Sequence, residues 1–189
     1  MRPVPSAADP VAEAARSLRF EQRVLPHLDA AYGLARWLAR AEHDAEDVLQ
    51  EAMLRAYRYY DGRDDGNTHA WLLAIVRNTF YTLHRQTVAA REEEFDEAIH
   101  DAADGAPTPE ARLLQEADIR QLRDAIERLP LEYREVLVLR EFEECSYKDI
   151  AEITGLKMGT VMSRLARARD RLARQLGANA QGETHVALQ

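Results

Sequence analysis

The chain ends in a segment whose residue types suit the binding of anions. Residues 155–176 read GLKMGTVMSRLARARDRLARQL, and between Lys157 and Arg174 six basic residues stand against one acidic residue, Asp170, for a net charge of +5. At about 100° per residue, four arginines fall within about 80° of one another on a helix, namely Arg164, Arg167, Arg171 and Arg174. An apolar stripe lies about 120° away, made of Val161, Leu165, Ala168, Leu172 and Leu176. One face can therefore pack into a core while another offers cations to phosphates, a membrane surface or an acidic partner.

The residues before this segment have the spacing of a helix-turn-helix. Ala151 lies four residues before Gly155, and Val161 lies six residues after it. This pattern places a small residue where two helices cross, a glycine in a left-handed turn, and an apolar residue that packs back. The second helix would enter a major groove by its N-terminal end. We expect base edges to face Thr160, Met162, Ser163, Ala166 and Arg167, and phosphates to contact Lys148, Lys157 and Arg171, with Arg164 on the same cationic face. The alternative is a helical hairpin that serves packing only.

A second segment, residues 71–86, combines cations with aromatic rings. One side of the expected helix is apolar, with Trp71, Leu72, Ile75, Val76, Phe80 and Leu83. Another side carries Arg77, Tyr81, His84 and Arg85, with Asn78 adjacent. Rings that stack on unpaired bases and cations that hold the backbone are typical of single-stranded DNA binding. A core helix with an ordinary solvated face remains the alternative.

A third segment presents carboxylates on one helix edge. Asp47 and Glu51 are four residues apart, with Asp44 and Gln50 close by. Spacing alone favours helix capping by Asp44 and a solvated acidic face.

Helical periodicity predicts the elements that position these residues, and no convincing strand alternation occurs. We expect helices from Pro10, over 22–41, from Asp44 to Tyr60, and from a Thr68 cap to about 86, followed by four more after an acidic stretch. Residues 91–118 hold ten acidic and two basic side chains, and DGAPTP within them disfavours continuous helix. The prediction is an all-α fold of two small helical domains joined by an acidic linker, the C-terminal one a helix-turn-helix domain. Their expected bounds are 10–90 and 113–177, with a flexible linker over 91–112 and a disordered tail over 178–189.

Catalysis has no support in the sequence. Cys145 is the only cysteine, and the six histidines show no metal-ligand spacing. Neither a phosphate-binding glycine loop nor a nucleophile constellation is recognisable, so we expect no enzyme activity, metal or cofactor. No apolar run approaches the roughly 18 residues that a membrane span needs, and the N-terminus lacks an export signal, so a cytoplasmic location is expected.

Two stretches resemble the DNA-binding domains of bacterial sigma factors. Residues 129–176, LPLEYREVLVLREFEECSYKDIAEITGLKMGTVMSRLARARDRLARQL, resemble the domain that binds the minus-thirty-five promoter element. The stretches DAEDVLQEAMLRAYRYY and AWLLAIVRNTFYTLHR resemble the family's other DNA-binding domain. Two such domains with a short linker resemble the extracytoplasmic-function (ECF) group. The resemblance implies a transcription initiation subunit that binds bacterial core RNA polymerase and promoter DNA, and it implies an anti-sigma factor as a further partner.

The resemblance also implies roles for individual residues. Asp47, Gln50 and Glu51 would bind the clamp coiled coil of the largest polymerase subunit. The melted minus-ten element, with one base flipped out, would meet residues 61–68 and the side chains of Trp71, Arg77, Asn78, Tyr81, His84 and Arg85. Thr82, Met162 and the loop sequence GRDDGN depart from residues that many relatives carry, which affects promoter preference. A stand-alone helix-turn-helix regulator and a helical interaction protein are the other function classes left open.

Overall fold

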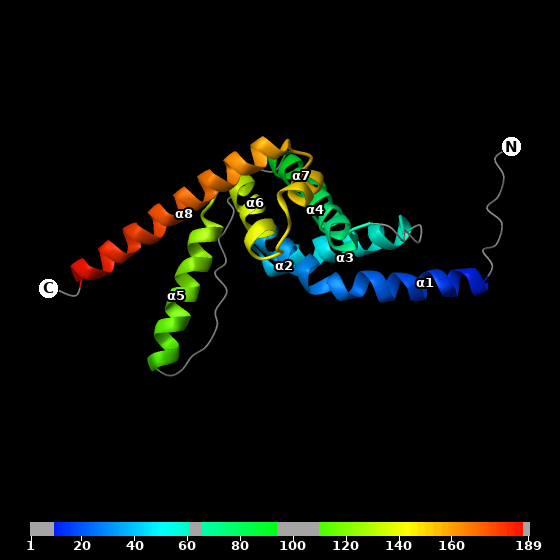
Figure 1. Cartoon of the computed structure of the whole chain (residues 1–189), viewed down its shortest axis with the longest axis horizontal. Helices are drawn as coiled ribbons and strands as arrows, with labels where there is room; N and C mark the ends of the chain where they lie inside the picture. Colours follow the sequence, from blue (N-terminus) through cyan, green and yellow to red (C-terminus); the bar gives the residue numbers. More distant parts are fainter. Residues whose placement is uncertain (1–9, 61–65, 94–109, 187–189) are drawn as a thin grey trace.

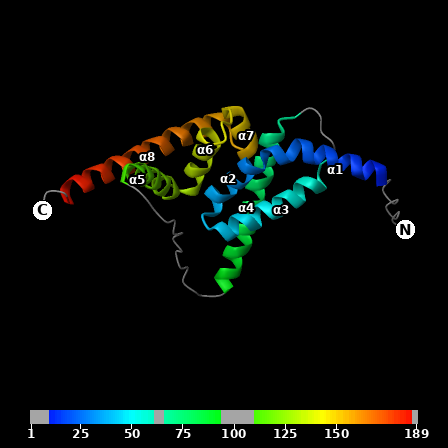
Figure 2. The same cartoon turned by 90° about the horizontal axis from the view of Figure 1, so that it is seen from below.

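The computed structural model describes residues 10–60, 66–93 and 110–186, which form helices joined by short turns, without a strand in these stretches. The elements are α1 (Pro10–Val24), the 3-10 helix η1 (Leu25–His27), α2 (Leu28–Ala39), α3 (Glu42–Arg58), α4 (Thr68–Glu93), α5 (Glu110–Glu127), α6 (Leu131–Glu141), α7 (Tyr147–Thr154) and α8 (Met158–Val186). Figures 1 and 2 show α1 leading away from a central group of helices on one side, and α5 and α8 on the other. The prediction of an all-α fold is confirmed.

Proline decides where the first long helix breaks. The sequence predicts one helix over 22–41, but α1 ends at Val24 and α2 begins at Leu28, with Pro26 in the 3-10 turn between them. Proline has no N–H to donate, and its ring clashes with the carbonyl of the preceding turn. The prediction of a continuous helix is therefore wrong at this point.

Two predicted helix caps also differ from the structure. Asp44 lies in the first turn of α3, and the capping position belongs to Ala41, whose side chain accepts no hydrogen bond. Thr68 is the first residue of α4, and the Oδ1 atom of Asn67 accepts a hydrogen bond of 3.1 Å from the backbone N–H of Ala70. Asparagine is a favoured N-cap because its side chain satisfies a backbone donor that the helix leaves open.

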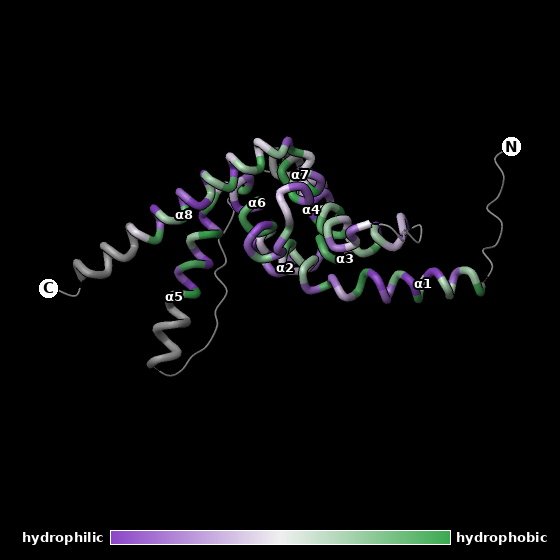
Figure 3. Tube along the Cα trace, viewed as in Figure 1, coloured by the Kyte–Doolittle hydropathy of each residue, from purple (hydrophilic) through white to green (hydrophobic). Residues whose placement is uncertain are grey.

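In the first domain, α2, α3 and α4 pack on one another around small and branched apolar residues. The fully or nearly fully buried side chains include Leu34, Leu38, Val48, Leu72 and Val76. Alanines at positions 45, 52 and 56 of α3 are also buried and allow the helices to approach closely. In Figure 3, apolar and polar residues alternate along α1 and α8. α8 buries Val161, Leu165 and Ala168, whereas α1, among its described side chains, buries only Phe20 and Val24 near its C-terminal end.

In the second domain, α6, α7 and α8 form the core, and the helix-turn-helix lies in α7 and α8. Ile150, Ile153, Val161 and Leu165 are buried between these helices. Ser146 caps α7 in a capping box with Asp149, and these hydrogen bonds hold the pKa of Asp149 below its usual value. The predicted helix-turn-helix is confirmed as a local structure.

The two domains pack against each other through a continuous hydrophobic core. α4 contacts α7, and α2 contacts α6. The rings of Trp37 in α2 and Phe142 after α6 lie with their centroids 5.2 Å apart. The sequence predicts the two domains but contains no indication of this packing.

The helices continue beyond the ends that the sequence predicts. α4 runs to Glu93 and α5 begins at Glu110, so only residues 94–109 of the predicted linker lie outside the described residues. α8 runs to Val186, where the sequence predicts a disordered tail from residue 178. Extending an existing helix adds one hydrogen bond for each residue ordered, and the alanines at 178 and 180 favour that extension.

Gly155 provides a test of the turn between α7 and α8. Its φ is 69°, in the left-handed region, and a Cβ at this position would meet nothing within 4 Å. Gly155→Ala is therefore expected to lower the free energy of unfolding by about 1 kcal/mol through backbone strain alone. Urea denaturation followed by circular dichroism measures the change. As a control, Gly159→Ala in the first turn of α8 is expected to raise that free energy by about 0.5 kcal/mol, and a loss at both positions would contradict the account.

Candidate polymerase and DNA interfaces

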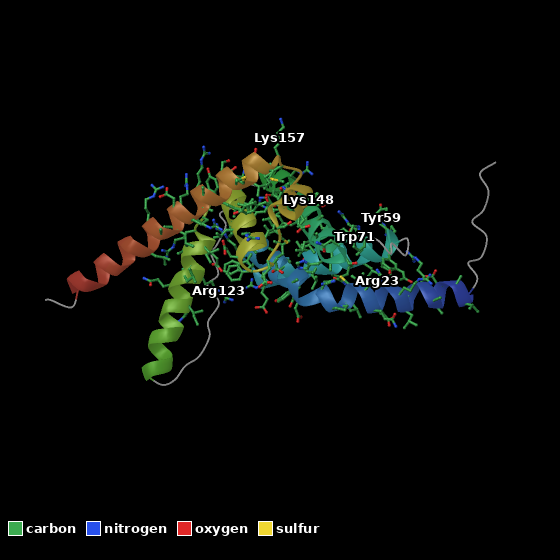
Figure 4. All side chains as sticks on the ribbon, in the orientation of Figure 1. Arg23, Tyr59, Trp71, Arg123, Lys148 and Lys157 are labelled. Atoms are coloured by element: carbon green, nitrogen blue, oxygen red, sulfur yellow. The ribbon has the colours of Figure 1, made fainter. Side chains whose placement is uncertain are left out.

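The helix-turn-helix presents the N-terminal half of α8 to solvent. Val161, Leu165 and Ala168 are buried against α6 and α7, which fixes the rotation of the helix. The opposite face then carries the predicted base-reading residues: Met162, Ser163, Ala166 and Arg167 are exposed, and Thr160 is half-buried. Figure 4 shows Lys157 at the start of α8 and Lys148 on α7, on the same side of the molecule. The structure brings these predicted contacts together on one surface, which we call the α8 face.

The arginines of α8 do not form a uniform cationic stripe. Arg164 lies 3.4 Å from a carboxylate oxygen of Glu132 in α6, with its side chain 25% exposed. The guanidinium of Arg171 lies 4.9 Å from the ring centroid of Tyr133, also in α6. Arg169 pairs with Glu141, and Arg174 pairs with Asp170. Arg167 is exposed and makes no ion pair with any residue that the structure describes, so it is the arginine of α8 best placed to contact a base.

α4 places the predicted single-strand contacts in two different surroundings. Asn78, His84 and Arg85 are exposed, and the ring of His84 stacks on Phe80 with centroids 5.4 Å apart. Arg77 and Tyr81, in contrast, are half-buried and face the second domain.

Arg77 binds a buried carboxylate of α6. Its Nε donates to Oε1 of Glu135 at 2.5 Å, and the two side chains are 18% and 1% exposed. The guanidinium of Arg77 also lies 4.6 Å from the ring centroid of Tyr81. Burial and, next, the charge of Glu135 raise the pKa of Tyr81, so its hydroxyl keeps its proton.

Trp71 lines a pocket of about 450 Å³ at the junction of the two domains. Tyr60, Asn67 and Ala74 come from the first domain, and Glu152 and Ile153 come from α7. Tyr60 lines this pocket without having been predicted as a site residue. The neighbouring Tyr59, also not predicted, does not line the pocket and is 64% exposed at the end of α3. The two adjacent tyrosines at the end of the predicted helix could have indicated a surface for base stacking.

The acidic edge of α3 is exposed and includes an apolar residue. Asp47 and Gln50 are exposed, and Glu51 is half-buried and pairs with Arg55 at 2.7 Å. Leu54, which is not among the predicted site residues, is 58% exposed and follows Asp47, Gln50 and Glu51 at helical spacing. The α3 face, defined as Asp47, Gln50, Glu51 and Leu54, therefore combines negative charge with an exposed leucine.

Two further arginines join the domains, and no sequence pattern pointed to them. Arg134 is 3% exposed, and it donates to the carbonyls of Glu127, at the end of α5, and Leu38, near the end of α2. Arg40 donates to the same Glu127 carbonyl at 2.6 Å. Burial lowers the pKa of Arg134 to about 10, which still leaves it charged at neutral pH. A cation at two helix C-termini interacts favourably with both helix dipoles.

No helix in the described ranges is long and apolar enough to cross a membrane. Among the same residues, no group of three or more His, Cys, Asp or Glu side chains could hold a metal ion.

Comparison with known proteins identifies both domains. The family model for Sigma-70 region 2 matches residues 24–90, and that for Sigma-70 region 4 matches residues 119–172. The RNA polymerase sigma-H factor of Pseudomonas aeruginosa is 34% identical over 166 residues, which cover 83% of this chain and 86% of that protein. The ECF RNA polymerase sigma factor SigE of Mycolicibacterium smegmatis is 33% identical over 153 residues, which cover 81% of this chain but only 60% of that protein.

A solved structure shows the same fold over most of the chain. The sigma factor RpoE from Bartonella quintana, crystallised in complex with the anti-sigma factor NepR, is 32% identical and superposes with a TM-score of 0.68. The match covers 84% of this chain and 96% of that one. The chain therefore belongs to the extracytoplasmic-function family of RNA polymerase sigma factors.

Proposed function

We propose that this chain, bound to bacterial core RNA polymerase in the cytoplasm, selects promoters by contacting two DNA elements with its two domains and helps to melt the minus-ten element. One observation carries the proposal: the same chain contains a helix-turn-helix with an exposed, cationic α8 face and, in its first domain, the helix α4, which combines arginines with aromatic rings. Both activities are binding functions, and neither needs a catalytic residue or a cofactor. The stand-alone helix-turn-helix regulator is not favoured, because residues 24–90 match a sigma-factor domain.

In this proposal the α8 face reads the minus-thirty-five element. Thr160, Met162, Ser163, Ala166 and Arg167 would face base edges in the major groove, and Lys148 and Lys157 would hold phosphates. Arg164 and Arg171 contact α6, so their contribution to phosphate binding requires that these contacts rearrange or that DNA approaches them at their exposed edges.

The first domain would bind the polymerase and the melted strand. The α3 face supplies the acidic and apolar contacts for the core enzyme, centred on Asp47, Gln50 and Glu51. The melted minus-ten strand would contact Trp71, Arg77, Asn78, Tyr81, His84 and Arg85. The pocket beside Trp71 has aromatic walls that suit a flipped base.

An anti-sigma factor is proposed as the regulatory partner. The sigma factor RpoE of Bartonella quintana was crystallised with such a protein, and this chain superposes on it over 84% of its length. Co-expression with proteins encoded beside this chain, followed by affinity purification, tests whether one of them forms a stable complex.

Run-off transcription tests the proposed function directly. Core RNA polymerase would be supplied with a genomic promoter library, with and without this protein. New start sites that require the protein are expected, and their upstream sequences would define both promoter elements. The absence of protein-dependent start sites, with a protein that binds duplex DNA without polymerase, would favour the stand-alone regulator instead.

Arg167 provides the sharpest test of the α8 face. Arg167→Ala is expected to weaken binding to minus-thirty-five duplex by about 1–3 kcal/mol, because an exposed guanidinium is available for a bidentate base contact. Fluorescence anisotropy of the holoenzyme on labelled promoter DNA measures the change. Arg169→Ala is the control, since Arg169 lies about 200° away on the helix and pairs with Glu141. Equal losses in the two variants would show that Arg167 contributes only charge.

A further inference from the structure

Two methionines are exposed in the first turns of α8. Met158 is 49% exposed and Met162 is 52% exposed, although methionine side chains are usually buried in folded proteins. They are four residues apart on the helix, so they lie within about 40° of each other, and exposed Ala166 continues the same line one turn further. We call these three residues the methionine patch. Met162 and Ala166 are among the predicted base-facing residues, whereas Met158 is not.

The packing of α8 fixes the side of the helix on which the methionine patch lies. Val161 and Leu165 are buried against α6 and α7, and Met162 lies about 90° from the centre of that buried face. Arg164 lies about 160° from Met162, on the other edge of the buried face, where it pairs with Glu132. The patch therefore belongs to the solvent-facing side of α8, on the edge away from the ion pair with α6.

The surroundings of the methionine patch favour a polyanion that also carries apolar groups. Exposed Lys157 precedes Met158, and exposed Arg167 follows Ala166. Figure 4 shows the side chain of Lys157 extending from the start of α8. No acidic residue stands at positions 156–168 of the sequence. Duplex DNA fits these surroundings, because it combines phosphates, which the cations attract, with methyl groups in its major groove.

The C5 methyl of thymine is the apolar group that the major groove offers. Guanine presents two acceptors there, adenine and cytosine each present an amino donor, and thymine presents a methyl beside its carbonyl. Methionine has no hydrogen-bond donor, so it cannot replace the water that guanine would lose in a close contact. Against a thymine methyl, the same side chain buries apolar surface on both partners.

We propose that the methionine patch selects thymine in the minus-thirty-five element, with Met162 in contact with a C5 methyl group. This inference rests on the proposed function and deepens it, because it takes the α8 face as the surface that enters the major groove. A helix rises about 1.5 Å per residue, so Met158 and Met162 lie about 6 Å apart along the axis, close to two base-pair steps. The element therefore carries at least one thymine, and Met158 is available to a second methyl about two base pairs away.

Removal of a single methyl group from the DNA tests the contact. Duplexes are first selected from a random library, by the holoenzyme and separately by the chain alone. Each thymine of the selected element is then replaced in turn by deoxyuridine, which lacks only the C5 methyl. With the wild-type chain we expect a loss of affinity of about fourfold at one thymine, as measured by fluorescence anisotropy. With Met162→Ala, which changes a half-exposed side chain, we expect the same replacement to cost less than about 1.5-fold.

Met162→Arg gives an independent result at the same base pair. A guanidinium can form two hydrogen bonds with guanine, so the preferred base is expected to change from thymine to guanine. The matched control is Ile119→Ala, which removes an exposed apolar side chain from α5, outside the α8 face and the methionine patch. This variant is expected to keep the deoxyuridine penalty of about fourfold. A penalty that disappears equally in Ile119→Ala and Met162→Ala would overturn the inference.

Run-off transcription separates the thymine contact from the proposed function. Protein-dependent start sites without a deoxyuridine-sensitive thymine in the minus-thirty-five element, or with a sensitivity that Met162→Ala retains, would overturn the thymine contact alone. A duplex that the chain selects without polymerase, with a penalty that depends on Met162 and no protein-dependent start sites, would support the contact and count against the proposed function. Failure of both the holoenzyme and the chain alone to select any duplex would overturn the contact, since the α8 face would then not bind DNA.

Discussion

Replacing Asp47 and Glu51 together with lysine is expected to lower the affinity for core RNA polymerase by at least about 100-fold. Both carboxylates lie on the α3 face, with side chains 57% and 40% exposed, so they are available to a basic partner surface. The double substitution changes the charge of this face by four units. It also puts a second cation beside Arg55, where the wild-type chain has an ion pair between Glu51 and Arg55. Biolayer interferometry with immobilised core enzyme measures the dissociation constant.

The control for this experiment lies on other helices of the same domain. Glu21→Lys together with Asp29→Lys makes the same four-unit change at exposed positions on α1 and α2, outside the α3 face. This variant is expected to bind core enzyme within about threefold of the wild type, since the altered charges lie away from the contact. Similar losses in the two double variants would mean that long-range charge, and not the α3 face, determines polymerase binding. Circular dichroism of both variants confirms that the helices are retained.

Arg134→Met is expected to lower the free energy of unfolding by about 3 kcal/mol. The guanidinium of Arg134 is almost fully buried and donates at 2.7 Å to Glu127 and at 3.3 Å to Leu38, one carbonyl in each domain. Methionine fills much of the same space but cannot donate, so the buried Leu38 carbonyl loses this partner while Arg40 still reaches Glu127. Because one of the two hydrogen bonds crosses between domains, we also expect the unfolding transition to become less cooperative. Urea denaturation followed by circular dichroism measures both quantities.

Arg128→Met serves as the comparison, since Arg128 is exposed and close in sequence to the same interface. A change within about 0.5 kcal/mol is expected there. If Arg134→Met also changed stability by less than about 1 kcal/mol, the cost of burying the charged guanidinium would offset its hydrogen bonds, as in some buried ionic networks. That result would contradict a stabilising role for Arg134 between the domains.

The features that the sequence predicts correctly depend on neighbours along the chain. The helix-turn-helix follows from Gly155, which adopts the left-handed turn without strain, and from apolar residues such as Ile150 and Val161 at helical spacing on either side. The family assignment follows from two stretches of this kind and is confirmed by the comparisons. Propensity and periodicity are local quantities, so a single chain is enough to read them. The break at Pro26 is also a local feature. The predicted helix over 22–41 passes through it because the apolar residues on both sides of Pro26 keep helical spacing, and that spacing was given more weight than the proline.

The features that the sequence could not predict depend on which helices meet. Spacing places Arg164, Arg167 and Arg171 on one side of α8, but only the tertiary structure sets Glu132 and Tyr133 of α6 against two of them and leaves Arg167 open. Helical periodicity gives the relative angles of the residues on one helix. It does not show which other helix packs against them.

Glu135 shows the same limit most clearly. It stands among charged and apolar residues on α6, where a sequence reading expects a glutamate to be solvated, yet it is buried against Arg77, 58 residues earlier in the chain. The sequence by itself determined the all-α class, the helix-turn-helix and the family. The tertiary structure alone decided which of the predicted DNA contacts are accessible, because burial depends on how complete helical surfaces fit together across the two domains.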